Sequence, residues 1–242
     1  MIKLELPQKP TELTAKLQAQ KTTEFINSGK KKKVWGMEWL KKAVLEMSFG
    51  KCCYTEIRLN EESKYMEIEH FYPKSKYPKK VLEWGNLLPS CKKCNIEKDE
   101  HDVKAEPIVN PFIDNPKEFF YFKNYKYHPK NEKGEKTISV LGINHFNHFV
   151  TPRSEVGVRI VEILEYLKGD IDKLGTDKEY RYIRQIKQLL ERGNRKKEYS
   201  ALTASTILND DNFSFIENTL KARNFWDNEL EELKNELIFC AL

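Results

Sequence analysis

The segment between residues 65 and 98 constrains the fold of this chain most strongly. A short alternating stretch, Tyr65–Phe71, predicts a β-strand that ends in an acid–histidine pair, and a basic loop and a helix-opening Cys-x-x-Cys knuckle follow. The side chains of chemical interest here are Glu69, His70, Asn86, Cys91, Cys94 and Asn95. Carboxylate and amide oxygens can share a hard divalent cation, and an imidazole beside them can take a proton from water. The segment therefore predicts a metal-dependent phosphodiesterase centre.

Each polar side chain of this segment has an expected role. Glu69 and Asn95 would bind the cation through oxygen atoms, which favours Mg²⁺ or Mn²⁺ over ions that prefer soft ligands. His70 can be neutral at cellular pH and would deprotonate the attacking water. Asn86 would orient His70 and fix its tautomer, through its side-chain carbonyl or through the backbone near it. Because neighbouring strand residues point to opposite faces, Glu69 and His70 reach one site only if the strand end twists.

The spacing of Cys91 and Cys94 is typical of one half of a tetrahedral zinc site, and the second half is expected near Cys52. Thr55 stands where a Cys-x-x-Cys that starts at Cys52 would place its second thiol. Three thiolates completed by water, a histidine or another ligand would hold zinc. The alternative is a set of buried free thiols that pack the strands against the helix, and the sequence leaves both interpretations open.

Lysines surround the proposed centre in the sequence. Lys74, Lys76 and Lys98 are the candidates for contact with the phosphates of nucleic acid, and a role in solubility is the alternative. The formal net charge of +5 also favours anionic partners, with nucleic acid first among them. The run Lys30–Lys33 fits either a phosphate-contacting arm or a solvated helix end.

The pattern of the whole chain predicts an α+β protein with four regions. These are a helical arm at 1–50, the metal-site module at 51–102, a connector and β-hairpin at 103–150, and a helical region at 151–242 that would contact a partner. The predicted elements are helices over 11–27 and 34–50, strands over 52–59 and 65–71 around a turn at 60–63, and strands over 118–127 and 136–141 around Gly134.

Two features indicate a soluble protein of the cytoplasm. The sequence has no apolar run long enough to span a membrane, and its first residues lack a secretory signal pattern, so we expect no membrane partner. The five cysteines are an odd number, which suits a reduced compartment and a metal knuckle better than a framework of disulfides.

The pair Glu69–His70, Asn86 and the segment Cys91-Lys-Lys-Cys-Asn-Ile-Glu-Lys98 together resemble the HNH endonuclease pattern, which covers about residues 50–102. The resemblance implies a ββα-metal fold, in which a hairpin and a helix surround one cation. It implies that Glu69 binds metal, that His70 is the general base and that Asn86 orients it. Asn95 would take the last metal-binding position, where many members also have asparagine in place of histidine.

A narrower resemblance extends over the flanking regions, through the phrase Ile68-Glu-His-Phe-Tyr-Pro-Lys74, the connector at 107–116 and the helical tail. It is to the PtuB family of HNH nucleases from Septu-type antiphage systems, some of them linked to retrons. That family implies a PtuA-like ATPase that restrains the nuclease, a reverse transcriptase and msDNA complex in retron-linked systems, and cleavage of DNA or of RNA such as tRNA. The family usually has a Cys-x-x-Cys before the first strand, so Thr55 bears on zinc but not on the nuclease chemistry.

A protein that holds nucleic acid or a partner through a zinc knuckle, without cutting, is the alternative function. Such an adaptor needs the cysteines and lysines but has no use for Glu69 and His70 together. Cleavage that requires Mg²⁺ or Mn²⁺ and is abolished by EDTA separates the two functions.

Overall fold

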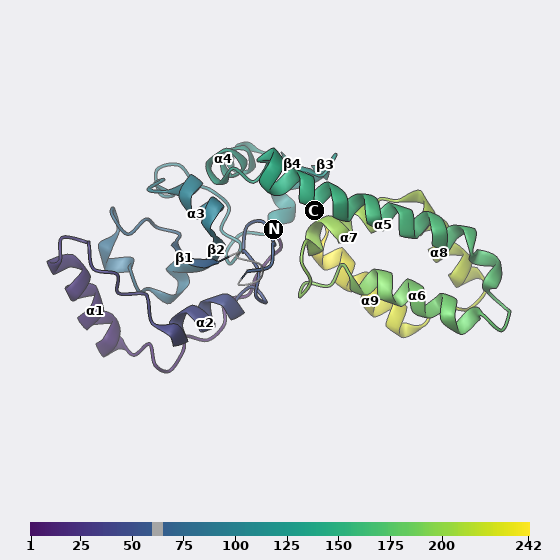
Figure 1. Cartoon of the computed structure of the whole chain (residues 1–242), viewed down its shortest axis with the longest axis horizontal. Coiled ribbons are helices and arrows are strands. Elements are labelled where there is room, and N and C mark those ends of the chain that lie inside the picture. The colour runs from purple at the N-terminus through teal and green to yellow at the C-terminus, as the bar shows by residue number, and fades with distance from the viewer. Residues whose placement is uncertain (60–64) are drawn as a thin grey trace. The chain divides into compact units, whose positions relative to one another are not determined.

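The computed structural model describes residues 1–59 and 65–242, which divide into two compact units (Figure 1). Unit 1 comprises Met1, Lys3–Phe120 and His128–Ile143, and unit 2 comprises Ile2, Tyr121–Tyr127 and Asn144–Leu242. Helices and short antiparallel sheets are both present, so the predicted α+β class is confirmed. The four-region division stays a prediction. Throughout the described residues, each helix is too short or too polar to cross a membrane.

Two helices begin unit 1, α1 (Ala15–Asn27) and α2 (Glu38–Glu46), as predicted but with shorter bounds. The hydroxyl of Thr14 caps α1 by accepting a hydrogen bond from the Leu17 amide at 3.1 Å. Gly29, with a φ of 65°, follows the helix end. Both helices bury their apolar faces in one hydrophobic cluster, whose members include Phe25, Leu40, Val44, Ile68, Leu82 and Leu87.

A two-stranded antiparallel sheet and a short helix carry the predicted centre. β1 (Met66–His70) pairs with β2 (Leu87–Cys91), and α3 (Lys92–Lys98) continues directly from β2 (Figure 1). In the register of this pair, His70 lies opposite Leu87 and Met66 lies opposite Cys91. The order of strand, strand and helix is the ββα arrangement. Short 3₁₀ helices at Pro78–Lys80 and Trp84–Asn86 lie in the long connection between the strands.

The strand predicted at 52–59 is wrong, because this segment forms turns and β1 pairs with β2 instead. Glu56 has a φ of 63°, and its amide donates to the Cys52 carbonyl at 2.9 Å, so the chain reverses direction inside the predicted strand. The turn predicted at 60–63 lies outside the described residues. Although its residues favour β-structure, this segment therefore forms a loop and is not a strand of the sheet.

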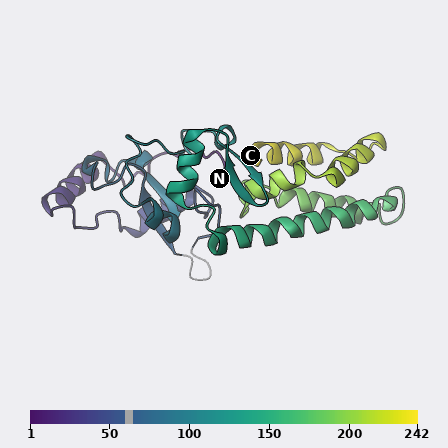
Figure 2. The same ribbon diagram turned by 90° about the horizontal axis from the view of Figure 1, so that it is seen from above.

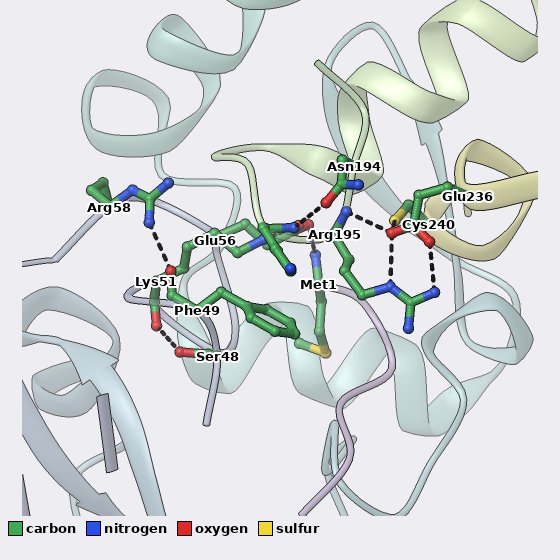
Figure 3. Close-up of polar contacts among 11 residues, drawn as sticks. Met1, Ser48, Phe49, Lys51, Glu56, Arg58, Asn194, Arg195, Glu236 and Cys240 are labelled. Carbon is green, nitrogen blue, oxygen red and sulfur yellow. Dashed lines mark hydrogen bonds and ion pairs between the residues drawn. The ribbon is translucent and has the colours of Figure 1, made fainter. Parts of the chain in front are cut away.

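Buried charges hold the turn around Glu56. Its Oε1 atom lies 2.6 Å from the α-ammonium of Met1, and its Oε2 atom lies 3.3 Å from Lys51 Nζ (Figure 3). The hydroxyl of Ser48 donates to the Lys51 carbonyl. Removing one partner from a buried ion pair leaves an uncompensated charge, which costs about 3–5 kcal/mol. Glu56 therefore fixes the loop that carries Cys52.

The second hairpin is shorter than predicted. β3 (Phe120–Lys123) and β4 (Lys126–Pro129) pair across a two-residue turn. Asn124 and Tyr125, the turn residues, have φ values of 50° and 60°, as a type I′ turn requires. A short 3₁₀ helix, Pro116–Glu118, precedes β3. The hairpin thus closes within the segment that the sequence assigned to a single strand.

The other predicted strand, 136–141, belongs instead to the helix α4 (Glu132–Leu141). The side chain of Asn131 caps this helix by accepting a hydrogen bond from the Gly134 amide at 3.0 Å. A Cβ atom added to Gly134 would lie 2.3 Å from the Phe119 carbonyl oxygen, so glycine permits a close approach here rather than a hairpin turn. This cap favours a helix over the segment that the sequence pattern assigned to a strand.

Unit 2 is a bundle of helices, and the predicted helical character of this region is confirmed (Figures 1 and 2). Its helices are α5 (Thr151–Gly169), α6 (Glu179–Glu191), α7 (Ser200–Leu208), α8 (Asp211–Ala222) and α9 (Asn228–Cys240), with a π-helical turn at Phe146–Val150 and a 3₁₀ helix at Ile171–Lys173. The short helix α7 is buried along almost its whole length and contacts α5, α8 and α9.

A bidentate ion pair joins the segment after α6 to α9. Arg195 Nε and Nη2 lie 2.7 and 2.6 Å from the two carboxylate oxygens of Glu236 (Figure 3). A Cβ atom added to the nearby Gly193 would lie 2.1 Å from Leu237 Cδ2, so glycine permits this close packing. Both contacts fix the segment that leads from α6 toward α7.

Candidate functional site

Three cysteines from separate segments of unit 1 meet at the start of α3. Cys52 comes from the loop after α2, Cys91 ends β2 and Cys94 lies in the first turn of α3. Their Sγ atoms lie within 4.8 Å of one another, and all three residues are buried. Tetrahedral zinc with Zn–S bonds of about 2.3 Å holds its sulfurs roughly 3.8 Å apart. The separation in the structure is compatible with this geometry, so this thiol cluster could hold zinc.

Thr55 lies beside the thiol cluster, at the position where the sequence lacks a fourth thiol. Burial raises the pKa of the Cys52 thiol, but its interactions with the neighbouring Cys91, Cys94 and Thr55 outweigh burial and hold this pKa well below its ordinary value. Burial raises the pKa of Cys94. The neighbouring Cys53 lies outside the cluster, and its amide donates to the Pro89 carbonyl at 2.9 Å.

Glu69, His70 and Asn95 line one cavity of about 180 Å³, which is also lined by Lys74 and Asp99. Their donor atoms are carboxylate oxygen, imidazole nitrogen and amide oxygen. The oxygen donors suit a hard cation such as Mg²⁺ or Mn²⁺. The structure thus brings together the three side chains that the sequence selected, and their roles toward a cation stay predictions. We name this feature the oxygen-lined cavity.

The position of Lys98 differs from the one that its predicted role, contact with nucleic acid, requires. Its side chain is fully buried, its Nζ atom lies 2.7 Å from Glu69 Oε1, and it donates to the His70 carbonyl at 3.0 Å. The helix α3 turns this side chain toward β1, away from solvent, which corrects the prediction. Burial raises the pKa of Glu69, and the Lys98 ammonium opposes that rise.

One ring nitrogen of His70 is engaged by the backbone. Nε2 lies 3.0 Å from the Val81 carbonyl oxygen. A carbonyl can only accept, so Nε2 carries the hydrogen and Nδ1 is the nitrogen that can take up a proton. Burial lowers the pKa of His70 to about 3, and the charge of Lys74 acts in the same direction, so the ring is neutral at neutral pH. Trp35 stacks edge-on, with 4.8 Å between ring centroids.

The Asn86 side chain, which the sequence assigned to orienting His70, bonds to the loop instead. Its Oδ1 accepts from the Tyr72 amide at 2.7 Å, and its Nδ2 donates to the Lys80 carbonyl at 2.9 Å and to the Tyr72 carbonyl at 3.2 Å. Lys80 directly precedes Val81, whose carbonyl bonds to His70. The Asn86 side chain therefore supports His70 through this loop, and its backbone carbonyl accepts from the amide of Phe71, directly after His70, at 3.0 Å.

Glu67 is a site residue that the sequence reasoning missed. The Asn95 Nδ2 donates to a Glu67 carboxylate oxygen. Glu67 and Glu69 share one face of β1, and Asn95 and Lys98 share one face of α3, so the strand and the helix meet through two parallel pairs. The spacing of two residues on the strand and three on the helix is the sequence signal that could have identified Glu67. With its NH₂ group bound, Asn95 keeps its Oδ1 for a cation.

Two lysines predicted to contact phosphate remain accessible. Lys74 is half-buried, with its Nζ 5.3 Å from the centroid of the Trp35 ring. Lys76 is exposed, with its Nζ 3.8 Å from Asp102 Oδ2. Lys74 lines the oxygen-lined cavity, and the contact of both lysines with nucleic acid stays a prediction.

Comparison with known proteins identifies the family of this chain. No protein-family model matches the chain. A Septu protein PtuB from Bacillus thuringiensis is 40% identical over 240 residues, which cover 96% of this chain and 92% of the relative. A second Septu protein PtuB, from Bacillus mycoides (strain KBAB4), is 31% identical over 189 residues, which cover 62% of this chain and 63% of the relative. The chain belongs to the Septu protein PtuB family.

Proposed function

We propose that this chain is a metal-dependent HNH endonuclease, the effector of an antiphage defence system, which hydrolyses phosphodiester bonds in nucleic acid. The observation that carries this proposal is the cavity that Glu69, His70 and Asn95 line together within a ββα arrangement. Membership of the PtuB family supports the place in Septu defence. DNA is a substrate candidate, and so is RNA such as tRNA.

The residues of the oxygen-lined cavity would divide the work of hydrolysis. Glu69 and Asn95 would hold Mg²⁺ or Mn²⁺, which supplies stabilisation of the charge that develops on the phosphate and on the departing oxygen. Glu67 would keep the Asn95 amide oxygen turned toward the cavity. His70 would take the proton of the attacking water on Nδ1, while the Val81 carbonyl holds the hydrogen on Nε2. The products would carry 5′-phosphate and 3′-hydroxyl ends.

The thiol cluster would have a structural role in this proposal. Cys52, Cys91 and Cys94 would bind zinc and tie the loop after α2 to the start of α3. A PtuA-like ATPase would be the partner that restrains the nuclease, with a reverse transcriptase and msDNA complex added in a retron-linked system. A knuckle protein that binds without cutting is the competing function, and it leaves the buried Glu69–Lys98 pair and the cavity without a role.

The test is cleavage by the chain in complex with its ATPase partner, on plasmid DNA and on tRNA, with Mg²⁺ or Mn²⁺ and with EDTA. Replacing His70→Asn should lower the rate by roughly 10²–10⁴-fold, the usual contribution of a general base. His148→Asn is the matched control, because His148 is exposed in unit 2. Cleavage by His70→Asn at the wild-type rate would remove the proposed base. Wild-type complex that binds nucleic acid but never cuts it would favour the adaptor.

A further inference from the structure

A second and larger cavity adjoins the oxygen-lined cavity. Its volume is about 650 Å³, α2 and β1 contribute to its lining, and it shares Lys74 and Asn95 with the smaller cavity. A strand of nucleic acid with its scissile phosphate at the oxygen-lined cavity would place a neighbouring nucleotide here. We name this feature the basic cavity.

The charges that line the basic cavity favour phosphate. Its described lining includes Lys33, Lys41, Lys42 and Lys74, against two glutamates. Glu38 is neutralised by Lys41, with 2.6 Å between Nζ and Oε1, and Glu67 is engaged by the Asn95 amide. The lining therefore keeps a positive excess. Ammonium groups at such a site bind the backbone of either DNA or RNA without reading the sequence.

Aromatic rings also line the basic cavity. Trp35 and Tyr65 line the same cavity, and Tyr65, directly before β1, is 73% exposed. The Lys74 ammonium lies over the Trp35 ring. Lysines that follow the backbone and aromatic rings on which bases stack are the combination that binds single-stranded nucleic acid.

The size of the basic cavity indicates which form of nucleic acid would use these rings. Its volume falls within the roughly 300–1,000 Å³ of ligand pockets, which is room for a nucleotide but not for a duplex. A base within a duplex is stacked and cannot lie against Tyr65 unless it leaves the stack. A concave site with aromatic walls beside the candidate metal ligands is therefore suited to a nucleotide already out of a helix.

We propose that the basic cavity binds an unstacked nucleotide beside the scissile phosphate, so that the substrate is single-stranded or locally opened nucleic acid. This inference rests on the proposed nuclease function. Tyr65 stacks on the base, and Lys42 and Lys74 contact the flanking phosphates. The preference for an open strand applies to DNA and RNA alike, because the base face and the phosphate are common to both.

Binding by the full-length His70→Asn variant, with Mg²⁺ present, tests the inference. Fluorescence anisotropy would compare a labelled unstructured oligonucleotide with the same oligonucleotide annealed to its complement. Tyr65→Ala should weaken single-strand binding at least roughly fivefold, and Tyr65→Phe should retain it, since stacking on an aromatic ring does not need the hydroxyl. Tyr180→Ala is the matched control, because Tyr180 is 79% exposed in unit 2. Lys42→Ala should reduce the dependence of binding on salt.

Equal affinity for single strand and duplex would overturn the inference, and so would single-strand binding that Tyr65→Ala leaves unchanged. Binding is measured here without cleavage, so the two proposals fail separately. A wild-type complex that shows the strand preference but no metal-dependent cleavage would support the basic cavity and refute the nuclease. A complex that cleaves duplex and single strand equally would support the nuclease and refute the inference.

Discussion

The thiol cluster and the oxygen-lined cavity both draw on α3, through the consecutive residues Cys94 and Asn95, but they differ in donor chemistry and in open space. The thiol cluster uses soft sulfur donors, all of them buried, drawn from a loop, a strand end and a helix. The oxygen-lined cavity uses hard donors and keeps about 180 Å³ of open space beside them. Structural zinc sites are closed, and catalytic metal sites keep a position for water or substrate. From this difference we expect a structural role for the thiol cluster and a catalytic role for the oxygen-lined cavity.

The largest expected effect would separate the two roles by removing a single thiol. Cys52→Ser should abolish zinc binding, and since structural zinc contributes on the order of 10 kcal/mol in small zinc peptides, the free energy of unfolding should fall by several kcal/mol. Metal content by mass spectrometry and thermal unfolding would measure this. Cys53→Ser is the matched control, because Cys53 is buried one residue away and outside the cluster. If both variants kept their zinc and stability, the thiol cluster would have no structural role.

A smaller effect is expected from removing the carboxylate of Glu67, which accepts a hydrogen bond from the Asn95 amide. Glu67→Ala should lower the affinity for Mn²⁺ by roughly 10–100-fold, the usual cost of losing a group that orients a metal ligand. Glu67→Gln should lose less, because it keeps an acceptor oxygen for the Asn95 amide. Electron paramagnetic resonance of free Mn²⁺ provides a readout independent of cleavage.

The control for this experiment is Glu38→Ala, since Glu38 lines the basic cavity but pairs with Lys41 instead of Asn95. Unchanged Mn²⁺ affinity in Glu67→Ala would show that the hydrogen bond does not position Asn95. Unchanged thermal stability alongside weaker binding would confirm that Glu67 acts on the ion rather than on the fold.

The smallest expected effect is a gain at the thiol cluster. Thr55→Cys would supply a fourth thiolate, so zinc affinity should rise, and a stability gain of about 1 kcal/mol would raise the melting temperature by roughly 2–4 °C. Thr203→Cys is the control, because Thr203 is equally buried but lies in α7. Weaker zinc binding in Thr55→Cys would mean that Thr55 stands away from the open position of the cluster.

Local patterns in the sequence selected side chains that lie together in the structure, but they misassigned several elements around them, and the roles of these side chains stay predictions. Adjacent residues, short spacings and donor chemistry selected Glu69, His70 and Asn95, and the structure places all three on one cavity. Strand pairing depends on long-range contacts that a local pattern does not contain. The partner of β1 is therefore β2 rather than the segment at 52–59.

Other errors arise from contacts, some local and some between distant segments, that the hydrophobic pattern does not contain. The cap at Asn131 converted an apparent strand into α4, and Gly134 packs on a carbonyl rather than forming a turn. Lys98 looked like a surface charge until the packing of α3 on β1 placed it against Glu69. The Asn86 side chain bonds to the loop that carries Val81 rather than to the His70 ring, which no spacing in the sequence encodes.

The peptide bond between Cys94 and Asn95 couples the thiol cluster to the oxygen-lined cavity. Cys94 and Asn95 are consecutive residues of α3, and neighbours on a helix project roughly 100° apart, so a single turn aims one side chain at sulfur and the other at oxygen. Any drift of that turn moves both at once. If the thiol cluster holds zinc and the oxygen-lined cavity a catalytic ion, as proposed, then removing zinc with a chelator should displace Asn95 and lower the rate of hydrolysis.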